Sequence, residues 1–371
     1  MIIQMSKVKI GITFGGYCPL HQGHLDVIMK AKKENDLCYV FVCGYDNDRG
    51  GDYLPLQKRF RLIKNFLESE NVIVCKIDDT QLGLDESMSA KNWSIWLKEV
   101  YRQIESDWHY VSDSEPIFNW YVSEERYVND IKNNSNKDCN IVFMDRTQNN
   151  ISGTMCRANP LKYWNKITTP FRPYYSHNIL ITGTASEGKT TLVTDIGKYF
   201  GIPYSYEKGR DNCHLKTDPE FDAEDFMYNL YEQHSYNKFL ISSSENQGIF
   251  ISDTDNCVTL MYAWAYSGRK NFSITPYEYE ILYCVTELYS KKTKWDKIFL
   301  LKPHNKEIVD DGERYMPDSD FEIRLSFYEF LKTLYDRFGY EYEELSGSYY
   351  ENFIRVKNYI NTLKEVSNND K

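Results

Sequence analysis

The sequence predicts an α/β protein of two domains, each built on a parallel sheet. Its 371 residues are too many for one ordinary core, since a domain averages roughly 150 residues. At two places, 8–33 and 178–192, a strand-like apolar run passes through a glycine-rich turn into a helical pattern. We therefore predict one domain over residues 1–172 and a second over 173–371, with the linker in the latter part of 160–177, which is rich in proline and aromatic residues.

The charge and the cysteine content count against several classes of protein. Forty-four basic and fifty-four acidic residues leave a net charge of −10, which disfavours general binding to nucleic acid or to a membrane surface. The nine cysteines are scattered and form no C-x-x-C pair, so we expect reduced thiols in a cytoplasmic protein. No apolar run reaches the ~18–20 residues that span a bilayer, and Met1–Lys7 lacks the apolar core of a secretion signal.

Strands and helices alternate through the first half of the sequence. Apolar runs of strand length are separated by segments with apolar residues at helical spacing. The polar stretch Asn129–Asp138 is predicted to be a loop. The expected strands are Val8–Phe14, Cys38–Gly44, Val72–Ile77, Phe118–Val122 and Cys139–Met144, and the expected helices are Leu25–Lys33, Leu56–Glu68 and Ala90–Ile104.

The first strand opens into a turn that carries two histidines. Gly15 and Gly16 follow the strand, and His21 and His24 enclose Gly23 at the start of the next helix. Two imidazoles at a helix N-terminus, beside exposed backbone N–H groups, can stabilise a triphosphate as charge builds on its α-phosphorus. Strand, glycine turn, H-x-G-H and helix in this order resemble the signature of the nucleotidylyltransferase superfamily, whose fold is a doubly wound parallel sheet.

A second element of the same superfamily follows a later strand. Residues 151–157, ISGTMCR, match its I-S-x-T-x-x-R pattern. Ser152 and Thr154 can cap a helix, and Arg157, one turn on, can direct its guanidinium at the β- and γ-phosphates of ATP. The H-x-G-H motif and this element support each other because they occur in the expected order.

The second half repeats the alternation of strands and helices. Its first strand is followed at once by a glycine-rich turn, and acidic residues follow a later strand. This order again favours a parallel sheet with ligands at the carboxyl ends of its strands. The expected strands are Asn178–Thr182, Ile202–Tyr206, Gly248–Ser252 and Lys297–Leu301, and the expected later helices are Pro219–Leu240, Phe321–Phe338 and Tyr349–Val366.

Residues 183–190 contain the clearest functional motif of the chain. GTASEGKT satisfies the pattern G-x-x-x-x-G-K-[ST] between a predicted strand and a predicted helix, which is the context of a P-loop. In such a loop backbone N–H groups surround phosphate oxygens, the lysine adds positive charge at the β- and γ-phosphates, and the next hydroxyl binds Mg²⁺. The residues predicted to bind ATP here are Gly183, Ser186, Gly188, Lys189, Thr190 and Thr191.

Charged residues follow two later strands of the second half. Asp253 and Asp255 come directly after strand 248–252, and side chains two apart on an extended chain point the same way, so both carboxylates can face the P-loop. One would hold Mg²⁺ and the other would accept a proton from an attacking hydroxyl, and the sequence leaves open which does which. Arg314, at the end of VDDGER, can reach the transferred phosphoryl group from a lid.

The order of these parts resembles the NadR-type family of bifunctional nicotinamide-nucleotide adenylyltransferases and ribosylnicotinamide kinases. The likeness covers nearly the whole chain, from the glycine turn at 15–25 to residues 309–314. It implies a Rossmann-like H-x-G-H nucleotidylyltransferase domain followed by a P-loop kinase domain, each on a doubly wound parallel sheet. It also implies two reactions that use ATP as co-substrate, with Mg²⁺. The second domain would phosphorylate nicotinamide riboside to nicotinamide mononucleotide (NMN), and the first would join NMN to ATP, giving NAD and pyrophosphate.

The resemblance also implies roles for individual residues. Trp93 and Trp96 lie on one face of a predicted helix, where such a pair is more often core than a ligand platform, yet the resemblance favours Trp93 as a platform for the pyridine ring. The other implied roles are adenylyl transfer for His21, His24 and Arg157; triphosphate binding for Gly15, Gly16, Ser152 and Thr154; phosphoryl transfer for Lys189 and Asp253; Mg²⁺ binding for Thr190 and Asp253; and ribose binding for Arg210 and Asp255.

Three alternatives stay open on the sequence alone. Bifunctional coenzyme A synthesis and sulfate activation also combine an H-x-G-H adenylyltransferase with a P-loop kinase, but the tryptophan pair and VDDGER favour the nicotinamide function. A non-catalytic ATP sensor would not require the second acid of D-x-D.

Some family members carry a helix-turn-helix DNA-binding domain ahead of the transferase. Only seven residues precede the first strand here, so we expect no such regulation, and small-molecule partners instead: nicotinamide riboside, NMN, ATP and NAD. A homo-oligomer is compatible with the sequence.

Overall fold

The structure, a computed structural model, divides the chain into two compact units, Met1–Arg172 and Pro173–Lys371. It describes residues 7–46, 53–84, 90–107, 115–145, 151–213, 220–270, 272–304, 318 and 320–369. Each unit contains its own five-stranded parallel sheet. In this part of the chain no helix is both long enough and apolar enough to cross a membrane.

The first unit has the strand order β3-β2-β1-β4-β5. The chain builds β1, β2 and β3 outward from the centre and then returns to place β4 on the other side of β1. This reversal makes β1 and β4 the switch point of a doubly wound sheet. The strands are β1 (Lys9–Gly15), β2 (Leu37–Gly44), β3 (Val72–Asp78), β4 (Ile117–Val122) and β5 (Cys139–Phe143), and the helices are α1 (Gln22–Glu34), α2 (Leu56–Leu67), α3 (Ala90–Ser106), α4 (Glu125–Asn134) and α5 (Gly153–Ala158).

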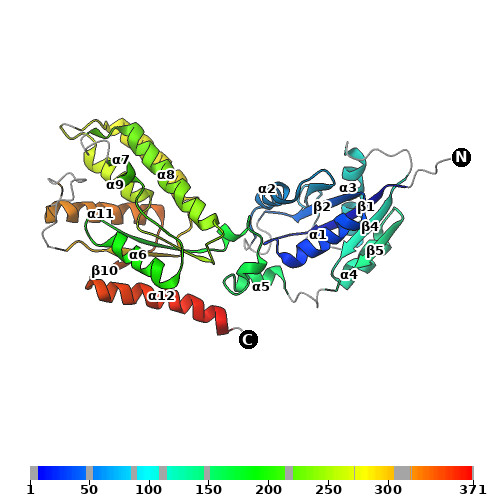
Figure 1. The fold of residues 1–371 in the computed structure, drawn as a ribbon. Coiled ribbons are helices and arrows are strands. Elements are labelled where there is room, and N and C mark those ends of the chain that lie inside the picture. Colours follow the sequence, from blue (N-terminus) through cyan, green and yellow to red (C-terminus); the bar gives the residue numbers. More distant parts are fainter. Residues whose placement is uncertain are drawn as a thin grey trace. The chain divides into compact units, whose positions relative to one another are not determined.

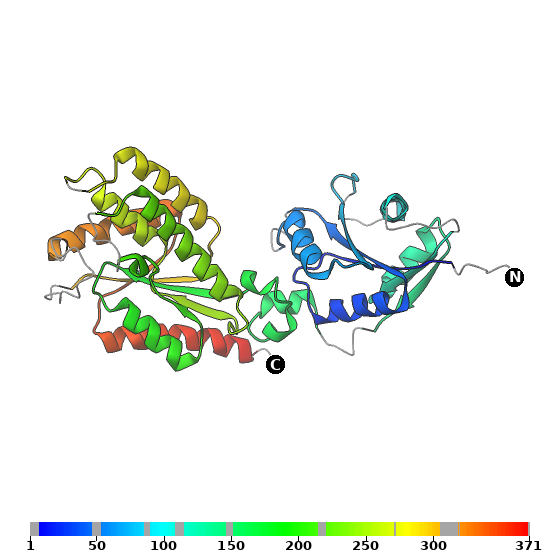
Figure 2. The ribbon, with the colours of Figure 1, turned by 45° about the horizontal axis from the view of Figure 1, so that its top comes forward.

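Both faces of this sheet are buried at β2, which explains why that strand is a continuous apolar run. Along β2, Tyr39 and Phe41 belong to a core that includes the buried face of α3, whereas Val40 and Val42 point to the opposite face. Helices α1 and α3 therefore cover opposite sides of the sheet, as Figure 2 shows within this unit.

The second unit has the strand order β10-β9-β6-β8-β7, so β6 is central. The P-loop follows β6, and the strands on either side, β9 and β8, come later in the chain. The strands are β6 (His177–Gly183), β7 (Tyr204–Ser205), β8 (Ile249–Ser252), β9 (Lys297–Leu301) and β10 (Glu343–Leu345), and the helices are α6 (Lys189–Phe200), α7 (Gly209–Cys213), α8 (Ala223–Ser242), α9 (Asn256–Tyr266), α10 (Pro276–Ser290), α11 (Phe321–Phe338) and α12 (Tyr349–Asn369).

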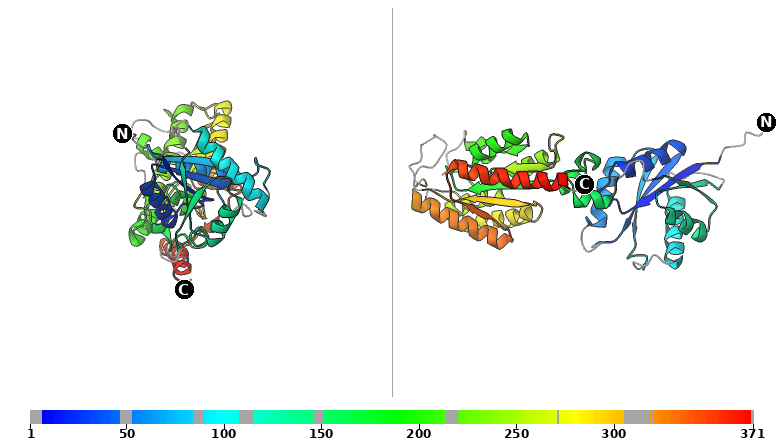
Figure 3. Two further views of the ribbon diagram at one scale, coloured as in Figure 1. Left: turned by 90° about the vertical axis from the view of Figure 1, so that its right-hand side faces the viewer. Right: turned by 90° about the horizontal axis from the view of Figure 1, so that it is seen from below.

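Two helical layers enclose the sheet of the second unit. Helices α6 and α12 pack together on one face, and they lie side by side in Figures 1, 2 and 3. Helices α8, α10 and α11 pack around α9 on the other face, where Leu180 and Leu300 of the sheet enter their core. The predicted fold class, two doubly wound parallel α/β domains, is confirmed.

The element predictions succeed for strands and fail in part for helices. Each predicted strand is present in the described residues, and β10 is an addition. The loop predicted over Asn129–Asp138 is wrong as far as Asn134, because α4 continues there and buries Ile131. Helices α9 and α10 escaped prediction because apolar and aromatic residues surround most of their circumference, which hides a helical period.

Candidate active sites

A cavity of about 280 Å³ lies at the switch point of the first unit. It is bounded by the ends of β1 and β4 and by the start of α5, and this is where a doubly wound sheet binds its ligands. Ser152 is the N-cap of α5 and accepts a hydrogen bond from the Met155 N–H at 3.2 Å, as predicted. Among the residues predicted to bind ATP or to catalyse transfer, the lining includes Gly15, Gly16, His24, Ser152 and Thr154.

The two motifs of this unit lie against each other although they are far apart in the sequence. A Cβ added to Gly23 would come within 3.0 Å of Ile151 Cγ2, and one added to Gly153 would come within 3.3 Å of the Cys18 carbonyl. Arg157 donates a hydrogen bond to the same carbonyl at 2.6 Å. Residues 15–25 and 151–157 therefore pack against each other, with glycine at both points of close contact.

The two histidines occupy different positions at this cavity. His24 lines it, whereas His21 is 3% exposed and lies outside the lining of the cavity among the described residues. The rings are stacked with centroids 3.7 Å apart, and Tyr17 packs edge-on against His24 at 4.9 Å. His24 is thus the imidazole that a ligand in the cavity can contact, and His21 and Tyr17 fix its ring.

An unpredicted tyrosine links the arginine of the second motif to the glycine turn. The Arg157 guanidinium carbon lies 4.7 Å from the centroid of the Tyr53 ring, and that of Arg59 lies 5.3 Å from it. Arg59 is fully buried and donates to the carbonyls of Gly16 and Cys43, at 2.6 and 2.9 Å. Two positive groups are therefore held beside the cavity, which suits an anionic ligand. Tyr53 belongs to no motif, so the sequence offered no signal for it.

The tryptophan pair is core in this structure. Trp93 and Trp96 are 3% and 2% exposed, because α3 turns its apolar face toward the sheet. Trp93 packs against Phe14 and Tyr127, with ring centroids 6.0 and 5.7 Å away. Those two residues line the cavity, whereas Trp93 is absent from its lining in the described part of the unit. The structure therefore gives Trp93 a supporting position behind the wall instead of the platform that we expected.

The loop between β6 and α6 has the conformation of an anion cradle. Gly183 has φ 144°, and a Cβ there would meet the Leu301 carbonyl at 2.8 Å, so glycine is required. Ser186 and Gly188 have φ values of 68° and 79°, in the left-handed region. The loop leads into the N-terminus of α6 at Lys189, where unsatisfied N–H groups and the helix dipole favour phosphate.

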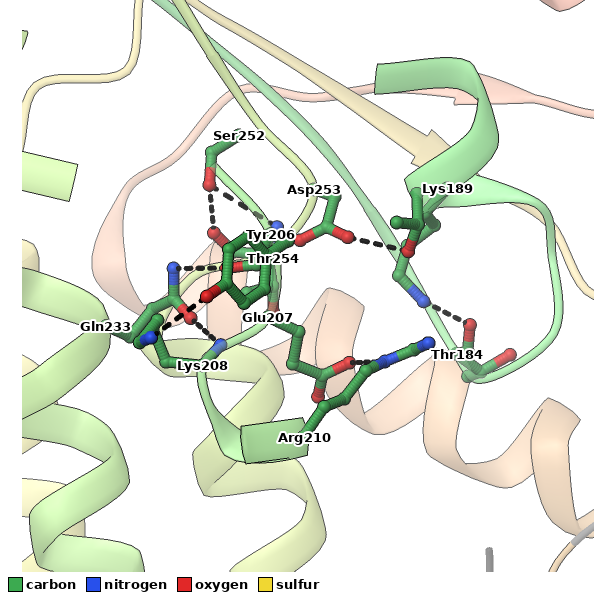
Figure 4. Close-up of polar contacts among 11 residues, drawn as sticks. Thr184, Lys189, Tyr206, Glu207, Lys208, Arg210, Gln233, Ser252, Asp253 and Thr254 are labelled. Carbon is green, nitrogen blue, oxygen red and sulfur yellow. Dashed lines mark hydrogen bonds and ion pairs between the residues drawn. The ribbon is translucent and has the colours of Figure 1, made fainter. Parts of the chain in front are cut away.

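Lys189, Thr190 and Asp253 converge beside this loop, as Figure 4 shows for the two labelled residues Lys189 and Asp253. Lys189 is buried and donates to the Thr184 carbonyl at 2.7 Å, and its burial lowers the pKa of the ammonium group. The Thr190 hydroxyl donates to Asp253 Oδ2 at 2.7 Å. The other oxygen, Oδ1, is buried without a hydrogen-bond partner in the described structure. The unpartnered Asp253 oxygen and the Thr190 hydroxyl are together suitable oxygen ligands for Mg²⁺.

A second carboxylate, Glu207, completes the charged group at this loop. It follows β7 and pairs with Arg210 of α7, with 3.4 Å between Glu207 Oε2 and Arg210 Nε (Figure 4). Its negative charge acts on both Lys189 and Asp253. Sequence reasoning singled out Arg210 but missed Glu207, although both belong to one short polar stretch after a predicted strand.

Asp255 lies in different surroundings from Asp253. It is the N-cap of α9 and accepts hydrogen bonds from the N–H groups of Cys257 and Val258, at 3.1 and 3.4 Å. It also accepts from the Tyr335 hydroxyl at 3.1 Å. These are the contacts of a buried helix cap, so the two carboxylates do not share one pocket as we predicted. The strand β8 ends at Ser252 and the backbone bends at Asp253, so the alternation of the strand does not continue to Asp255. Arg314 lies outside the described residues.

From the burial of Asp253 we predict how the stability of the second unit depends on pH. Burial, and then the charge of Glu207, raise the pKa of Asp253 from 3.8 to about 6. The folded protein therefore binds a proton that the unfolded chain releases between about pH 4 and 6, and stability falls as pH rises through that window. We expect Asp253→Asn to stabilise the ligand-free second unit by about 1–2 kcal/mol at pH 7.5. The gain should shrink toward pH 4 in urea unfolding followed by circular dichroism. A lower stability of Asp253→Asn than of wild type at pH 7.5 would contradict the raised pKa of Asp253.

Two protein-family models match this chain, one in each unit. Residues 12–159 match the cytidylyltransferase-like family, and residues 178–352 match the family described as AAA domain. The first match spans the cavity and both of its motifs. The second spans the P-loop and the charged group around it.

Relatives and solved structures match both units together. The trifunctional NAD biosynthesis/regulator protein NadR of Salmonella typhimurium is 26% identical over 301 residues, which are 77% of this chain and 70% of that protein. A NadR protein in complex with NR is 29% identical with a TM-score of 0.78, and covers 91% of this chain and 89% of its own. A NadR protein in complex with NAD and AMP-PNP is 28% identical with a TM-score of 0.79, and covers 95% and 97%.

Proposed function

We propose that this chain is a NadR-type enzyme of NAD biosynthesis and that its two units catalyse two successive reactions at separate sites. The second unit transfers the γ-phosphoryl group of ATP to the 5′-hydroxyl of nicotinamide riboside, giving NMN and ADP. The first unit transfers the adenylyl group of a second ATP to NMN, giving NAD and pyrophosphate. The observation that carries the proposal is that each unit gathers its distant motifs at the carboxyl edge of its own sheet.

We assign adenylyl transfer to the cavity at β1 and β4. A phosphate oxygen of NMN attacks the α-phosphorus of ATP, and the bond to the bridging oxygen breaks as pyrophosphate leaves. His24 is positioned to donate a hydrogen bond to the phosphate as charge builds up there, and Arg157 adds a positive charge held by Tyr53. Phe14 and Tyr127 offer aromatic surface for a flat ring, with Trp93 packed behind them.

We assign phosphoryl transfer to the P-loop of the second unit. The riboside hydroxyl attacks the γ-phosphorus, its proton passes to a carboxylate, and ADP leaves. Lys189 can exchange the Thr184 carbonyl for a phosphate oxygen as its hydrogen-bond acceptor, which places its positive charge at the transferred group. Glu207 is our candidate for the proton acceptor, in place of Asp253, because Asp253 is already bonded to Thr190. Arg210, paired with Glu207, can bind the ribose.

Mg²⁺ belongs to the kinase proposal through Thr190 and Asp253. Their hydrogen bond and the unpartnered Oδ1 atom of Asp253 fit a hard cation that also binds phosphate oxygens. When bound, the ion neutralises charge on the β- and γ-phosphates. Thr190 and Asp253 would hold the ion, while Lys189 and the loop N–H groups orient the phosphates.

Asp255 gives a test that separates a helix cap from a ribose ligand. Asp255→Ala removes both cap hydrogen bonds and should cost the second unit about 1–2 kcal/mol, whereas Asp255→Asn keeps the cap and should cost much less. Neither should change the KM for nicotinamide riboside by more than about twofold. Urea unfolding and steady-state kinetics measure the two quantities. If the KM for nicotinamide riboside rose about tenfold in a stable Asp255→Asn protein, Asp255 would be a ribose ligand after all.

A substrate panel tests the proposed function directly. Purified protein receives ATP, Mg²⁺ and either nicotinamide riboside, phosphopantetheine or sulfate, and the products are separated by liquid chromatography. We expect NAD from nicotinamide riboside and no dephospho-coenzyme A or activated sulfate from the other two. Turnover of phosphopantetheine or sulfate in place of the riboside would select one of the alternative bifunctional enzymes. ATP binding without any product would indicate a sensor.

A further inference from the structure

One variable position of the P-loop carries a carboxylate. Glu187 lies between Ser186 and Gly188, which both have left-handed φ values. Its negative charge acts on Lys189, two residues later. A negative side chain in an anion cradle would repel the phosphates and compete with them for Lys189. The P-loop pattern does not require an acid at this position, so the pattern does not indicate where the Glu187 carboxylate lies.

The Glu187 carboxylate is hydrogen-bonded to α11 and to the segment that follows β9. Arg324 of α11 donates to Glu187 Oε1 at 2.6 Å, and both side chains are at most 2% exposed. The His304 N–H donates to Glu187 Oε2 at 3.3 Å, and Arg324 also donates to the His304 carbonyl at 2.9 Å. Both oxygens of the carboxylate and both polar groups of the His304 backbone are thus engaged in one buried cluster.

We propose that Arg324 is a positioning residue for the kinase reaction, which draws Glu187 out of the phosphate cradle and neutralises it there. The His304 backbone links this pair to the segment that follows β9, and β9 pairs with β6 up to Gly183 and Leu301. Ser186 is therefore fixed in its left-handed conformation before nucleotide binds. This inference rests on the proposed kinase function of the same loop.

Loss of Arg324 should act on ATP much more than on the riboside. In Arg324→Gln the buried Glu187 carboxylate loses its guanidinium partner. It then competes with phosphate for Lys189. We expect the KM for ATP to rise about tenfold or more, with kcat changed less than about threefold and the riboside KM less than about twofold. Glu187→Gln leaves the Arg324 guanidinium buried without a carboxylate and should lower the unfolding midpoint. It should nevertheless raise the KM for ATP less than Arg324→Gln does, because it removes the charge that repels the phosphates.

The double variant separates positioning from general structural support. If repulsion by an unpaired Glu187 is the cause, Glu187→Gln should restore most of the ATP affinity when it is added to Arg324→Gln. Arg269→Gln is the matched control, since it removes the Arg269–Asp318 ion pair of the same unit, with 2.9 Å between Nη1 and Oδ1. It should leave the KM for ATP unchanged. Unfolding midpoints and adenylyl transfer by the other unit report whether each protein is folded.

Three outcomes would overturn the proposal. They are an unchanged KM for ATP in Arg324→Gln together with a lower unfolding midpoint, a double variant that binds ATP no better than Arg324→Gln, and an Arg269→Gln protein whose KM for ATP rises as strongly. If Arg324→Gln does not fold, Arg324→Lys and the double variant give the same comparison. Wild-type turnover of nicotinamide riboside decides the proposed function separately. If it is absent, the comparison uses calorimetry of the ATP-binding event that Lys189→Ala abolishes.

Discussion

Lys189→Ala should abolish phosphorylation of nicotinamide riboside and leave the conversion of NMN to NAD nearly unchanged. Lys189 is buried at the cradle and is bonded to the Thr184 carbonyl, so it is already placed for the β- and γ-phosphates. Its positive charge is the one on the loop that can balance charge on the transferred group. We expect kcat/KM of the kinase to fall by at least about 10³-fold, measured as NMN formed per minute.

The control for Lys189→Ala lies on the same helix. Lys198 is exposed in the last turn of α6, and Lys198→Ala should leave both activities within about twofold of wild type. A Lys189→Ala protein that is folded yet has lost both activities would show that the two reactions share a site. A protein that retains the kinase would remove the P-loop from the mechanism.

His24→Ala should have the opposite effect, with adenylyl transfer lost and the kinase retained. His24 is the histidine that lines the cavity, so its removal takes away a hydrogen bond made as charge builds on the α-phosphate. We expect kcat for NAD formation from NMN to fall by about 10²–10³-fold, with a much smaller change in the KM for ATP. Gln22→Ala, on the same turn and exposed, is the control, and it should retain the activity. An unchanged kcat in His24→Ala would refute the role of the cavity.

The fold was predictable from sequence because its strands carry a strong signal. Buried parallel strands such as β2 are continuous apolar runs, and the glycine turns after β1 and β6 mark where ligands bind. Helix prediction was weaker where tertiary packing decides. Ile131 packs a mostly polar segment, α4, against the core, and α9 is buried on nearly every side, so the sequence of α9 shows no clear helical period.

The candidate sites were predictable where a motif names its residues. His24, Arg157, Lys189 and Thr190 belong to fixed patterns, and the structure brings each pattern to the edge of a sheet. Tyr53, Glu207 and Arg324 belong to no pattern, because their roles depend on which loops meet in space. The alternation rule failed for Asp255 because β8 ends at Ser252 and the backbone bends at Asp253, and the Asp255 carboxylate caps α9.

Mixing the two inactive variants tests the central claim, that one chain holds two independent sites which act in sequence. Lys189→Ala and His24→Ala are assayed alone and together with nicotinamide riboside, ATP and Mg²⁺, and NAD is measured. We predict almost no NAD from either protein alone, NMN accumulation with His24→Ala, and NAD formation restored in the mixture as NMN passes through solution. A mixture of folded variants that forms NMN but still makes no NAD, although Lys189→Ala converts added NMN, would contradict the claim of independent sites.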